Sequence, residues 1–301
     1  MSLPVIDAHT HLAPMLPDDV PAPAVPAALH DPDALTSHLA VNALDAAIVS
    51  IPPPYFRQGQ DETASAAWVS TVNDGLLRRV AEHAALRPLA YLPLDQPAVA
   101  LAEWERRRTD PRWVGASASA GGRSASLADP ALEPLWRRLA DDGAAMLLHP
   151  GDSADPRLRE YYLANLLGNP VETAVAAAQL VFGGVLTRLP DLRILLVHCG
   201  GAVPALAGRW QRGHDTNRPG LDPAAEAPSA ALRRLATDTL SHDPRVVELA
   251  AAVFGPDQLT LGSDWPFPMG TPDPRAVLAN LPATLRARIE HGAARVFDHR
   301  L

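Results

Sequence analysis

The sequence predicts an α/β protein built as a single (β/α)8 TIM barrel over residues 1–301. Eight short apolar stretches alternate along the chain with longer segments whose apolar residues recur every three or four positions. This alternation is typical of parallel strands joined by helices. A chain of 301 residues also has the length of one barrel of about 250 residues with insertions.

Each element follows from its local pattern. The predicted strands are Val5–Ala8, Ala46–Ile51, Leu89–Leu92, Trp113–Ser117, Ala145–His149, Ile194–His198, Leu235–Asp238 and Leu259–Gly262. The predicted helices are Asp33–Leu44, Ala66–Ala84, Pro97–Arg107, Pro130–Ala140, Val171–Arg188, Val203–Arg212, Pro244–Val253 and Pro274–Leu281. Proline or aspartate often begins these helices, as helix N-termini prefer. We expect irregular loops at 14–26 and 212–228, which are rich in proline and small residues.

Composition excludes several classes of function. A formal net charge of −8 offers no basic surface for nucleic acid or an anionic membrane. No apolar run reaches the roughly 18–20 residues that span a bilayer, and no signal peptide is expected at the N-terminus. A single cysteine, Cys199, cannot form an internal disulfide, which fits a cytoplasmic protein. The chain has no lysine, which excludes a Schiff-base lysine, a P-loop lysine and a carbamylated lysine bridging two metals.

Two histidines stand one residue apart in "VIDAHTHLAP". Because strand side chains alternate between two faces, Asp7, His9 and His11 should project the same way. Two imidazoles at this spacing can converge on one metal ion. The pair alone is too short to exclude an idle, solvated strand end. Asp7 could orient a ligand histidine or belong to a polar layer inside the barrel.

Three more polar residues follow predicted strands in the same manner. His149 ends the fifth strand in "AAMLLHP", His198 ends the sixth in "LRILLVHCGG", and Asp264 follows the eighth in "LTLGSDWPFP". The active site of such a barrel is built at the C-terminal ends of its strands. With His9 and His11, these residues therefore place five groups suited to metal binding on one rim, and the sequence predicts a metal centre there. Cys199 is expected to turn away and fill the core.

At these residues the chain resembles a known family. The segments "DAHTH", "LLHP", "LVHCGG" and "LGSDWPFP" resemble the amidohydrolase superfamily in its amidohydrolase-related branch, and within it the aminocarboxymuconate semialdehyde decarboxylases. "NDGLLRRVAEHAALRPLAYLPL" and "TDTLSHDP" extend the resemblance over nearly the whole chain. It implies a barrel of the metal-dependent hydrolase type with one divalent metal ion, usually zinc.

The resemblance also implies roles for single residues. His9, His11, His149 and Asp264 match the metal ligands, with water completing the site. His198 matches the catalytic histidine, which would take a proton from the metal-bound water to leave a hydroxide.

The resemblance further implies how substrate is held. Arg209, in "AGRW", matches an arginine that reaches a substrate carboxylate of the neighbouring subunit, which implies a homodimer. The guanidinium fork suits a carboxylate, although a plain helix-surface arginine is the alternative. Trp265 and Phe267 follow Asp264 and could wall the pocket or simply pack under the barrel lip.

Two departures concern the substrate. The stretch "PAVPAALHDPDAL" lacks an arginine that the decarboxylases use before the first helix, and an aromatic residue is replaced near Asn165. The substrate pocket is therefore expected to differ from that of the aminomuconate enzymes.

The sequence is compatible with three functions. The first is nonoxidative decarboxylation, by a carboxy-lyase, of a small unsaturated or aromatic carboxylic acid. The second is metal-dependent hydrolysis or hydration of a lactone, amide or enol acid. The third is a noncatalytic metal-binding barrel, against which an intact His198 counts, because a structural metal needs no base.

Overall fold

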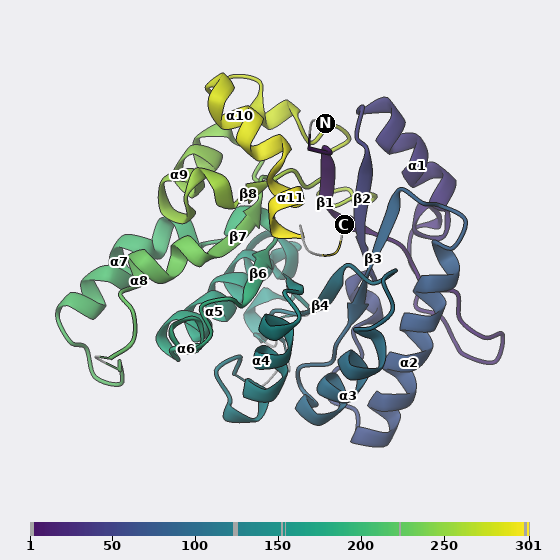
Figure 1. The fold of residues 1–301 in the computed structure, drawn as a ribbon, viewed down its shortest axis with the longest axis horizontal. Coiled ribbons are helices and arrows are strands. Elements are labelled where there is room, and N and C mark those ends of the chain that lie inside the picture. The colour runs from purple at the N-terminus through teal and green to yellow at the C-terminus, as the bar shows by residue number, and fades with distance from the viewer. Residues whose placement is uncertain are drawn as a thin grey trace.

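The computed structural model describes residues 3–122, 126–151, 153, 155–222, 224–297 and 300. Within these ranges eight parallel strands follow one another in chain order in one sheet. A backbone hydrogen bond of 2.9 Å from Ala8 N to Leu261 O joins the first strand to the chain after the last one. The helices surround the strands (Figure 1), so the predicted (β/α)8 barrel is confirmed.

The strands lie within a few residues of their predicted positions. They are β1 (Ile6–His11), β2 (Ala46–Ser50), β3 (Leu86–Tyr91), β4 (Gly115–Ser119), β5 (Ala145–His149), β6 (Arg193–Leu196), β7 (Leu235–Asp238) and β8 (Leu259–Thr260). The described α-helices are α1 (Pro32–Val41), α2 (Glu62–Arg79), α3 (Pro97–Arg107), α4 (Glu133–Asp141), α5 (Asn169–Phe182), α6 (Val185–Arg188), α7 (Val203–Asp215), α8 (Pro228–Ala231), α9 (Pro244–Phe254), α10 (Ala283–Glu290) and α11 (Gly292–Val296). Aspartate side chains cap α1, α2 and α9 by accepting hydrogen bonds from backbone N–H groups of the first turn.

Apolar side chains form one layer between the strands and the helices and a second layer inside the barrel. The inner layer includes Ile6, Ile48 and Leu147 together with Phe297, which follows α11. The side chain of Arg193, the first residue of β6, donates to the carbonyl oxygen of Val296 at 3.2 Å. α11 therefore closes the barrel at the N-terminal ends of the strands and leaves the opposite end for a site (Figure 1).

The prediction that Asp7 shares the inward face of β1 with His9 and His11 is wrong. The pairing of β1 with β2 shifts register between Asp7 and Thr10, as a β-bulge does. Asp7 instead approaches the α1 side chain His38, with its Oδ2 3.4 Å from the His38 Nε2. The extra residue resets the alternation, so that the two histidines still turn toward the barrel axis.

The predicted helix Pro274–Leu281 is also wrong. Only the 3-10 turn Ala276–Leu278 forms there, and α10 begins after Pro282. Proline lacks a backbone N–H and restricts the residue before it, so a helix cannot continue through this position. α10 has few apolar residues, which is why its period did not reveal it.

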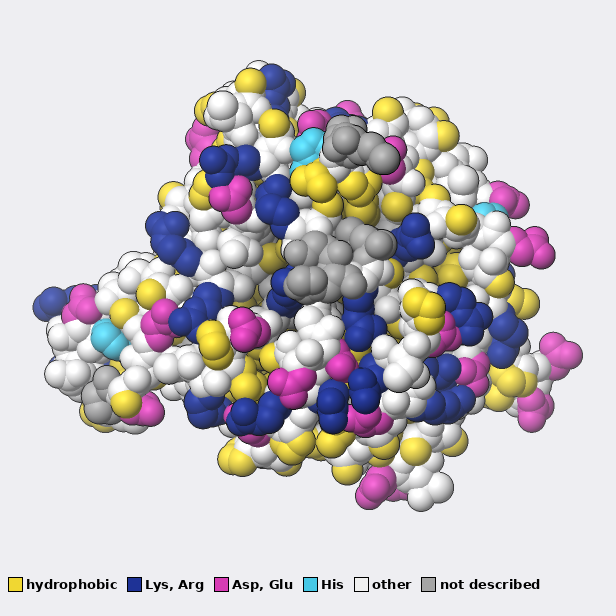
Figure 2. Space-filling model, in the orientation of Figure 1, with side chains coloured by type: hydrophobic (Ala, Val, Ile, Leu, Met, Phe, Trp, Pro, Cys, Tyr) yellow, Lys and Arg dark blue, Asp and Glu magenta, His cyan; other side chains and the backbone are white. Residues whose placement is uncertain are grey.

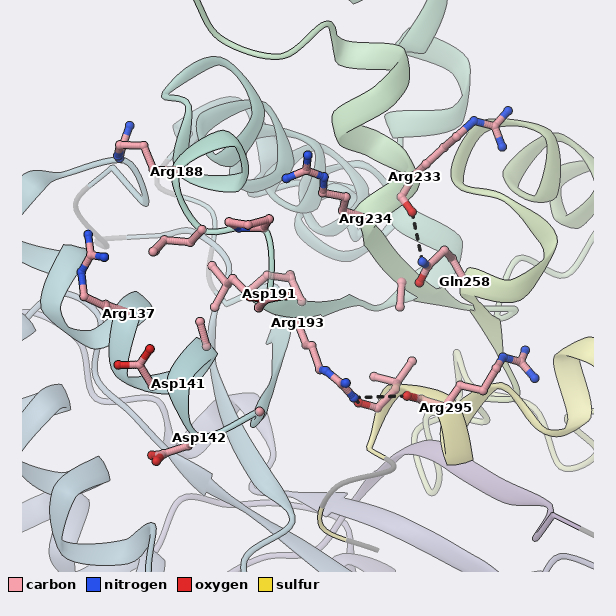
Figure 3. A pocket seen from close by; sticks show the side chains of 18 of the residues that line it. Arg137, Asp141, Asp142, Arg188, Asp191, Arg193, Arg233, Arg234, Gln258 and Arg295 are labelled. Carbon is pink, nitrogen blue, oxygen red and sulfur yellow. Dashed lines mark hydrogen bonds between the residues drawn. The ribbon is translucent and has the colours of Figure 1, made fainter.

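The closed end of the barrel carries a cavity of about 990 Å³ (Figure 3). Arg193, Arg234 and Gln258 line it, and each lies at or just before the start of a strand. Arginine and acidic side chains also lie side by side across the face seen in Figure 2. This cavity contains none of the predicted site residues. Among the described residues no helix has the length and apolar character needed to cross a membrane.

Candidate metal centre

All five residues predicted for the rim converge at the C-terminal ends of the strands. Nε2 of His9 lies 3.2 Å from Nε2 of His11 and 3.4 Å from Oδ1 of Asp264. Nε2 of His11 is 3.1 Å from the same carboxylate oxygen, and Nε2 of His149 is 4.0 Å from it. His198 completes the group, with its Nε2 3.6 Å from Oδ2 of Asp264.

Three of the histidines have their second ring nitrogen anchored. Nδ1 of His9 donates to Asp238 Oδ2 at 2.7 Å, and Nδ1 of His149 donates to the carbonyl oxygen of Pro150 at 2.8 Å. Nδ1 of His11 lies 3.0 Å from the Ser50 hydroxyl and 3.3 Å from a backbone carbonyl oxygen. A proton on each Nδ1 leaves a lone pair on each Nε2, and these nitrogens face one another.

This arrangement fits a bound metal ion. His149 Nε2 and Asp264 Oδ1 are buried, and neither has a hydrogen-bond partner of acceptable geometry among the described residues. Buried polar atoms are rarely left without a partner. Ligands at about 2.0–2.2 Å from one tetrahedral ion lie about 3.3–3.6 Å from one another, which is close to the separations of His9, His11 and Asp264.

Another set of four residues, which includes His198 but not His11, also lies within mutual reach. One ligand atom from each of His9, His149, His198 and Asp264 lies within 4.8 Å of all the others. His198 is therefore near enough to ligate, and distance alone does not separate ligands from base. Exposure differs, however. The side chain of His11 is fully buried, whereas that of His198 is 17% exposed.

The charges of the cluster suit a cation. Burial would raise the pKa of Asp264, but His9, His11 and His198 outweigh burial and hold that pKa well below its ordinary value. Burial lowers the pKa of His11, and burial together with the neighbouring imidazoles lowers the pKa of His149 well below its ordinary value. Burial also opposes a charge on His9, but Asp264 and Asp238 overcome it and raise the pKa of His9. Carboxylate and neutral imidazole are the forms that bind metals.

The backbone is strained where the site is built. His198, Cys199 and Asp264 have φ values of 55°, 54° and 57°. Non-glycine residues seldom adopt this left-handed region, which costs roughly 1–2 kcal/mol per residue. The turn after β6 ends the strand two residues earlier than predicted, directs the His198 ring to the centre and sends Cys199 into the outer core. Burial raises the pKa of the Cys199 thiol, which agrees with its expected role as a filler.

Asp238 is a site residue that sequence reasoning did not select. It is the last residue of β7, it is fully buried, and it holds the His9 ring. Its position at the end of a strand, like that of His149 at the end of β5, is the signal that could have revealed it. Asp7, for which the sequence left open a role in orienting a ligand histidine or a place in a polar layer, accepts hydrogen bonds from the backbone N–H groups of His9 and Ser263.

A cavity of about 290 Å³ opens beside the cluster. Its wall includes His198 and Asp264, and also Asn165, Leu166 and Met269. The position where the sequence departs from the decarboxylases therefore lines this cavity. A second cavity, of about 690 Å³, is lined by Phe56 and Arg57 among others.

The predicted aromatic walls differ in their placement. Phe267 meets the ring of His11 edge-on at a centroid distance of 5.3 Å, so it borders the metal centre. Trp265 packs near His38 at 6.2 Å, on the outer side of β1. Phe56, which the sequence did not single out, reaches His149 at 6.2 Å.

Arg209 lies outside its own chain's site. It is an exposed residue of α7, and its side chain has no hydrogen bond or ion pair with any described residue. It lines neither of the two cavities near the cluster. Among the described residues Arg209 therefore has no contact with the metal centre of its own chain.

Comparisons with known proteins agree with this geometry. A family model described as amidohydrolase matches residues 6–298. The 2-amino-3-carboxymuconate-6-semialdehyde decarboxylase of Dictyostelium discoideum is 29% identical over 247 residues, which are 80% of this chain and 68% of that protein.

Solved structures share the fold at lower identity. The 5-carboxyvanillate decarboxylase of Sphingomonas paucimobilis superposes with a TM-score of 0.83 at 23% identity over 99% of both chains. A dihydroxybenzoic acid decarboxylase from Polaromonas, solved with bound manganese and an inhibitor, gives a TM-score of 0.79 at 20% identity over 99% of this chain and 97% of that one.

Proposed function

This chain belongs to the amidohydrolase family, and we propose that within it the chain is a metal-dependent nonoxidative decarboxylase of a small unsaturated or aromatic carboxylic acid. The observation that carries the proposal is the buried cluster of histidines and Asp264 with a cavity at its edge. Relatives and structural neighbours named as decarboxylases of such acids support the reaction type.

His9, His11, His149 and Asp264 would hold one divalent ion. The second ring nitrogen of each of the three histidines is anchored, and their Nε2 atoms converge with the Asp264 carboxylate, as a metal site requires. We propose zinc, for which this set of imidazoles and a carboxylate is suited, although manganese is the ion bound in the Polaromonas enzyme. When bound, the ion would act as a Lewis acid on a water molecule and on the substrate.

His198 would move the proton. Its ring borders both Asp264 and the cavity, its Nδ1 has no hydrogen-bond partner among the described residues, and part of it is exposed. A histidine imidazole can accept a proton and return it. Removal of a carboxyl group leaves a carbon that must be protonated, and His198 stands where it can supply that proton.

The substrate would lie flat beside Phe267, whose ring already packs against His11. Trp265 would support this wall from behind rather than sandwich the ligand, because it packs near His38. The cavity of about 290 Å³ beside His198 and Asp264, which Phe267 borders only across the metal centre and does not line, would hold one ring or a short unsaturated chain.

We further propose a homodimer in which Arg209 enters the partner's site and binds a substrate carboxylate. The exposed position of Arg209, without an ionic partner among the described residues, supports this. The segment 161–175 also supports it, because this segment carries several exposed apolar side chains and one of them, Leu166, lines the cavity. These side chains are Tyr161, Tyr162, Leu166, Leu167, Val171 and Val175. A cytoplasmic location, consistent with one buried cysteine, is part of the proposal.

The test is a screen for released CO₂. The purified protein, loaded separately with zinc and manganese, is incubated with a panel of unsaturated and aromatic acids and, in parallel, with lactones and amides. CO₂ from acids supports the proposal. Product from lactones or amides without CO₂ would assign the hydrolase alternative. One metal ion per chain but no turnover with any compound would favour a noncatalytic barrel.

A further inference from the structure

One buried carboxylate joins two parts of the metal centre. Oδ2 of Asp238 accepts hydrogen bonds from His9 Nδ1 at 2.7 Å and from the His198 backbone N–H at 3.0 Å. Oδ1 accepts from the backbone N–H groups of Cys199 at 2.7 Å and Leu240 at 3.0 Å. All four donors therefore depend on one side chain, which is fully buried at the end of β7.

We propose that Asp238 is a positioning residue that couples the two halves of the site: it sets the ring tautomer of His9 for metal binding and holds the turn that places His198. The inference rests on the proposed metal and base roles of these histidines. It concerns how this chain prepares its own residues, and it assigns Asp238 no contact with substrate or metal.

Two acidic side chains compete for the ring proton of His9. His9 can place its proton on Nδ1, toward Asp238 at 2.7 Å, or on Nε2, toward Asp264 Oδ1 at 3.4 Å. Only the first choice leaves a lone pair on Nε2 for a metal. A short bond to a buried carboxylate is among the stronger hydrogen bonds in proteins. Asp238 therefore favours the metal-binding tautomer, and without it the nearby Asp264 carboxylate would favour a proton on Nε2.

Asp238 also binds the strained backbone turn after β6. His198 and Cys199 are both left-handed, at φ 55° and 54°, and Gly200 and Gly201 continue with positive φ values. Two adjacent non-glycine residues in this region need compensating interactions. The two oxygens of Asp238 bind the two N–H groups of this strained pair, one each. The same side chain that orients His9 thus keeps the His198 ring beside Asp264.

Substitution by asparagine isolates the effect. If the amide oxygen of Asp238→Asn faces His9, the NH₂ group faces the Cys199 and Leu240 donors. If the NH₂ group faces His9, it meets the His198 N–H and forces the His9 proton onto Nε2. Neither orientation satisfies all four partners, although the side-chain size is unchanged.

The matched control is Asp7→Asn. Asp7 is equally buried on β1 and also binds backbone N–H groups, those of His9 and Ser263, at 3.1 and 3.0 Å. It makes no bond to a ligand's ring. Both variants should lower the melting temperature of the metal-free protein, but only Asp238→Asn should weaken metal binding.

Metal affinity is measured by competition with a chromogenic chelator, using zinc and then manganese. We expect Asp238→Asn to weaken binding by about 10- to 100-fold, as loss of a partner to a ligand histidine does. Asp7→Asn should change it by less than about threefold. Equal losses in the two variants, or none in Asp238→Asn, would overturn the proposal.

A measurement on the unsubstituted protein guards against variants that fail to fold. ¹⁵N NMR of the histidine rings in metal-free protein, at a pH above the pKa of His9, shows which nitrogen carries the proton. The His9 signals are assigned by their loss in His9→Gln. We expect a protonated Nδ1, and a protonated Nε2 would overturn the tautomer argument.

The link to His198 is tested by a double-mutant cycle at saturating metal. If Asp238 acts on turnover through His198, then Asp238→Asn should lower kcat in the wild-type background but little in the His198→Ala background. Additive losses would overturn this half of the proposal. Metal affinity and ring protonation need no substrate, so these results stand apart from the CO₂ screen that decides the reaction.

Discussion

Substitution of His198 distinguishes its proposed role as a base from a role as a metal ligand, because its side chain makes no hydrogen bond to a described residue. Nδ1 has no hydrogen-bond partner among the described residues, and Nε2 is 3.6 Å from Asp264. The backbone N–H of His198 remains bound to Asp238 whatever the side chain. His198→Ala should therefore leave the three other histidines, Asp264 and the bound metal in place.

The expected fall in kcat follows from the proposed role of His198 in general acid–base catalysis. General acid–base catalysis contributes roughly 10²- to 10⁴-fold, so kcat should fall by that factor, equivalent to about 2.7–5.4 kcal/mol in activation free energy. Folding should suffer less. The left-handed φ of 55° at this position suits alanine poorly, and we expect a loss of about 1 kcal/mol in the free energy of unfolding. His198→Asn is the companion variant, because asparagine tolerates this region better.

The assay combines CO₂ release at saturating acid with metal analysis of the same sample. Both variants should keep one divalent ion per chain while kcat falls by at least about 100-fold. A folded variant that has lost its metal would make His198 a ligand and refute the assignment. Full activity with metal retained would refute the role as base.

Three further predictions follow from the site. Burial lowers the pKa of His11 and His149, so unfolding of the metal-free protein takes up protons at these two residues below about pH 6.5, and the free energy of unfolding should fall as the pH falls. His9 opposes this fall above that pH, because Asp264 and Asp238 raise its pKa despite burial; urea titrations that show no fall below about pH 6.5 would contradict the prediction. Arg209→Ala should leave the proposed dimer intact in light scattering and reduce kcat/KM by about 10- to 100-fold, as for a lost charged hydrogen bond, whereas a fully active monomer would exclude the proposed cross-subunit role. Phe267→Ala should raise KM for a planar acid by about tenfold, in keeping with the loss of an aromatic contact, while metal content stays at one ion per chain, and an unchanged KM would remove Phe267 from the substrate wall.

The sequence by itself determined the barrel and the rim of metal-binding groups. Apolar stretches alternating with helical periods predict parallel strands, and His149 and Asp264 follow such stretches directly. These patterns are formed by residues close together in the chain, so they can be recognised in the sequence. The chain order of the strands is also their order in the sheet, which is why residues far apart in sequence could be placed on one rim.

Only the tertiary structure decided which carboxylate accepts a hydrogen bond from which histidine ring. The alternation of side chains along a strand assigned Asp7 to the inner face, but a β-bulge in β1 turned it toward His38. Asp238, at the end of β7, holds the His9 ring instead. A β-bulge depends on how two strands pair, and this pairing produces no recognisable pattern in the sequence of either strand alone. The left-handed turn at His198 is likewise held by Asp238, 40 residues away in the chain. Contacts of that kind exist only once the strands have closed into a barrel.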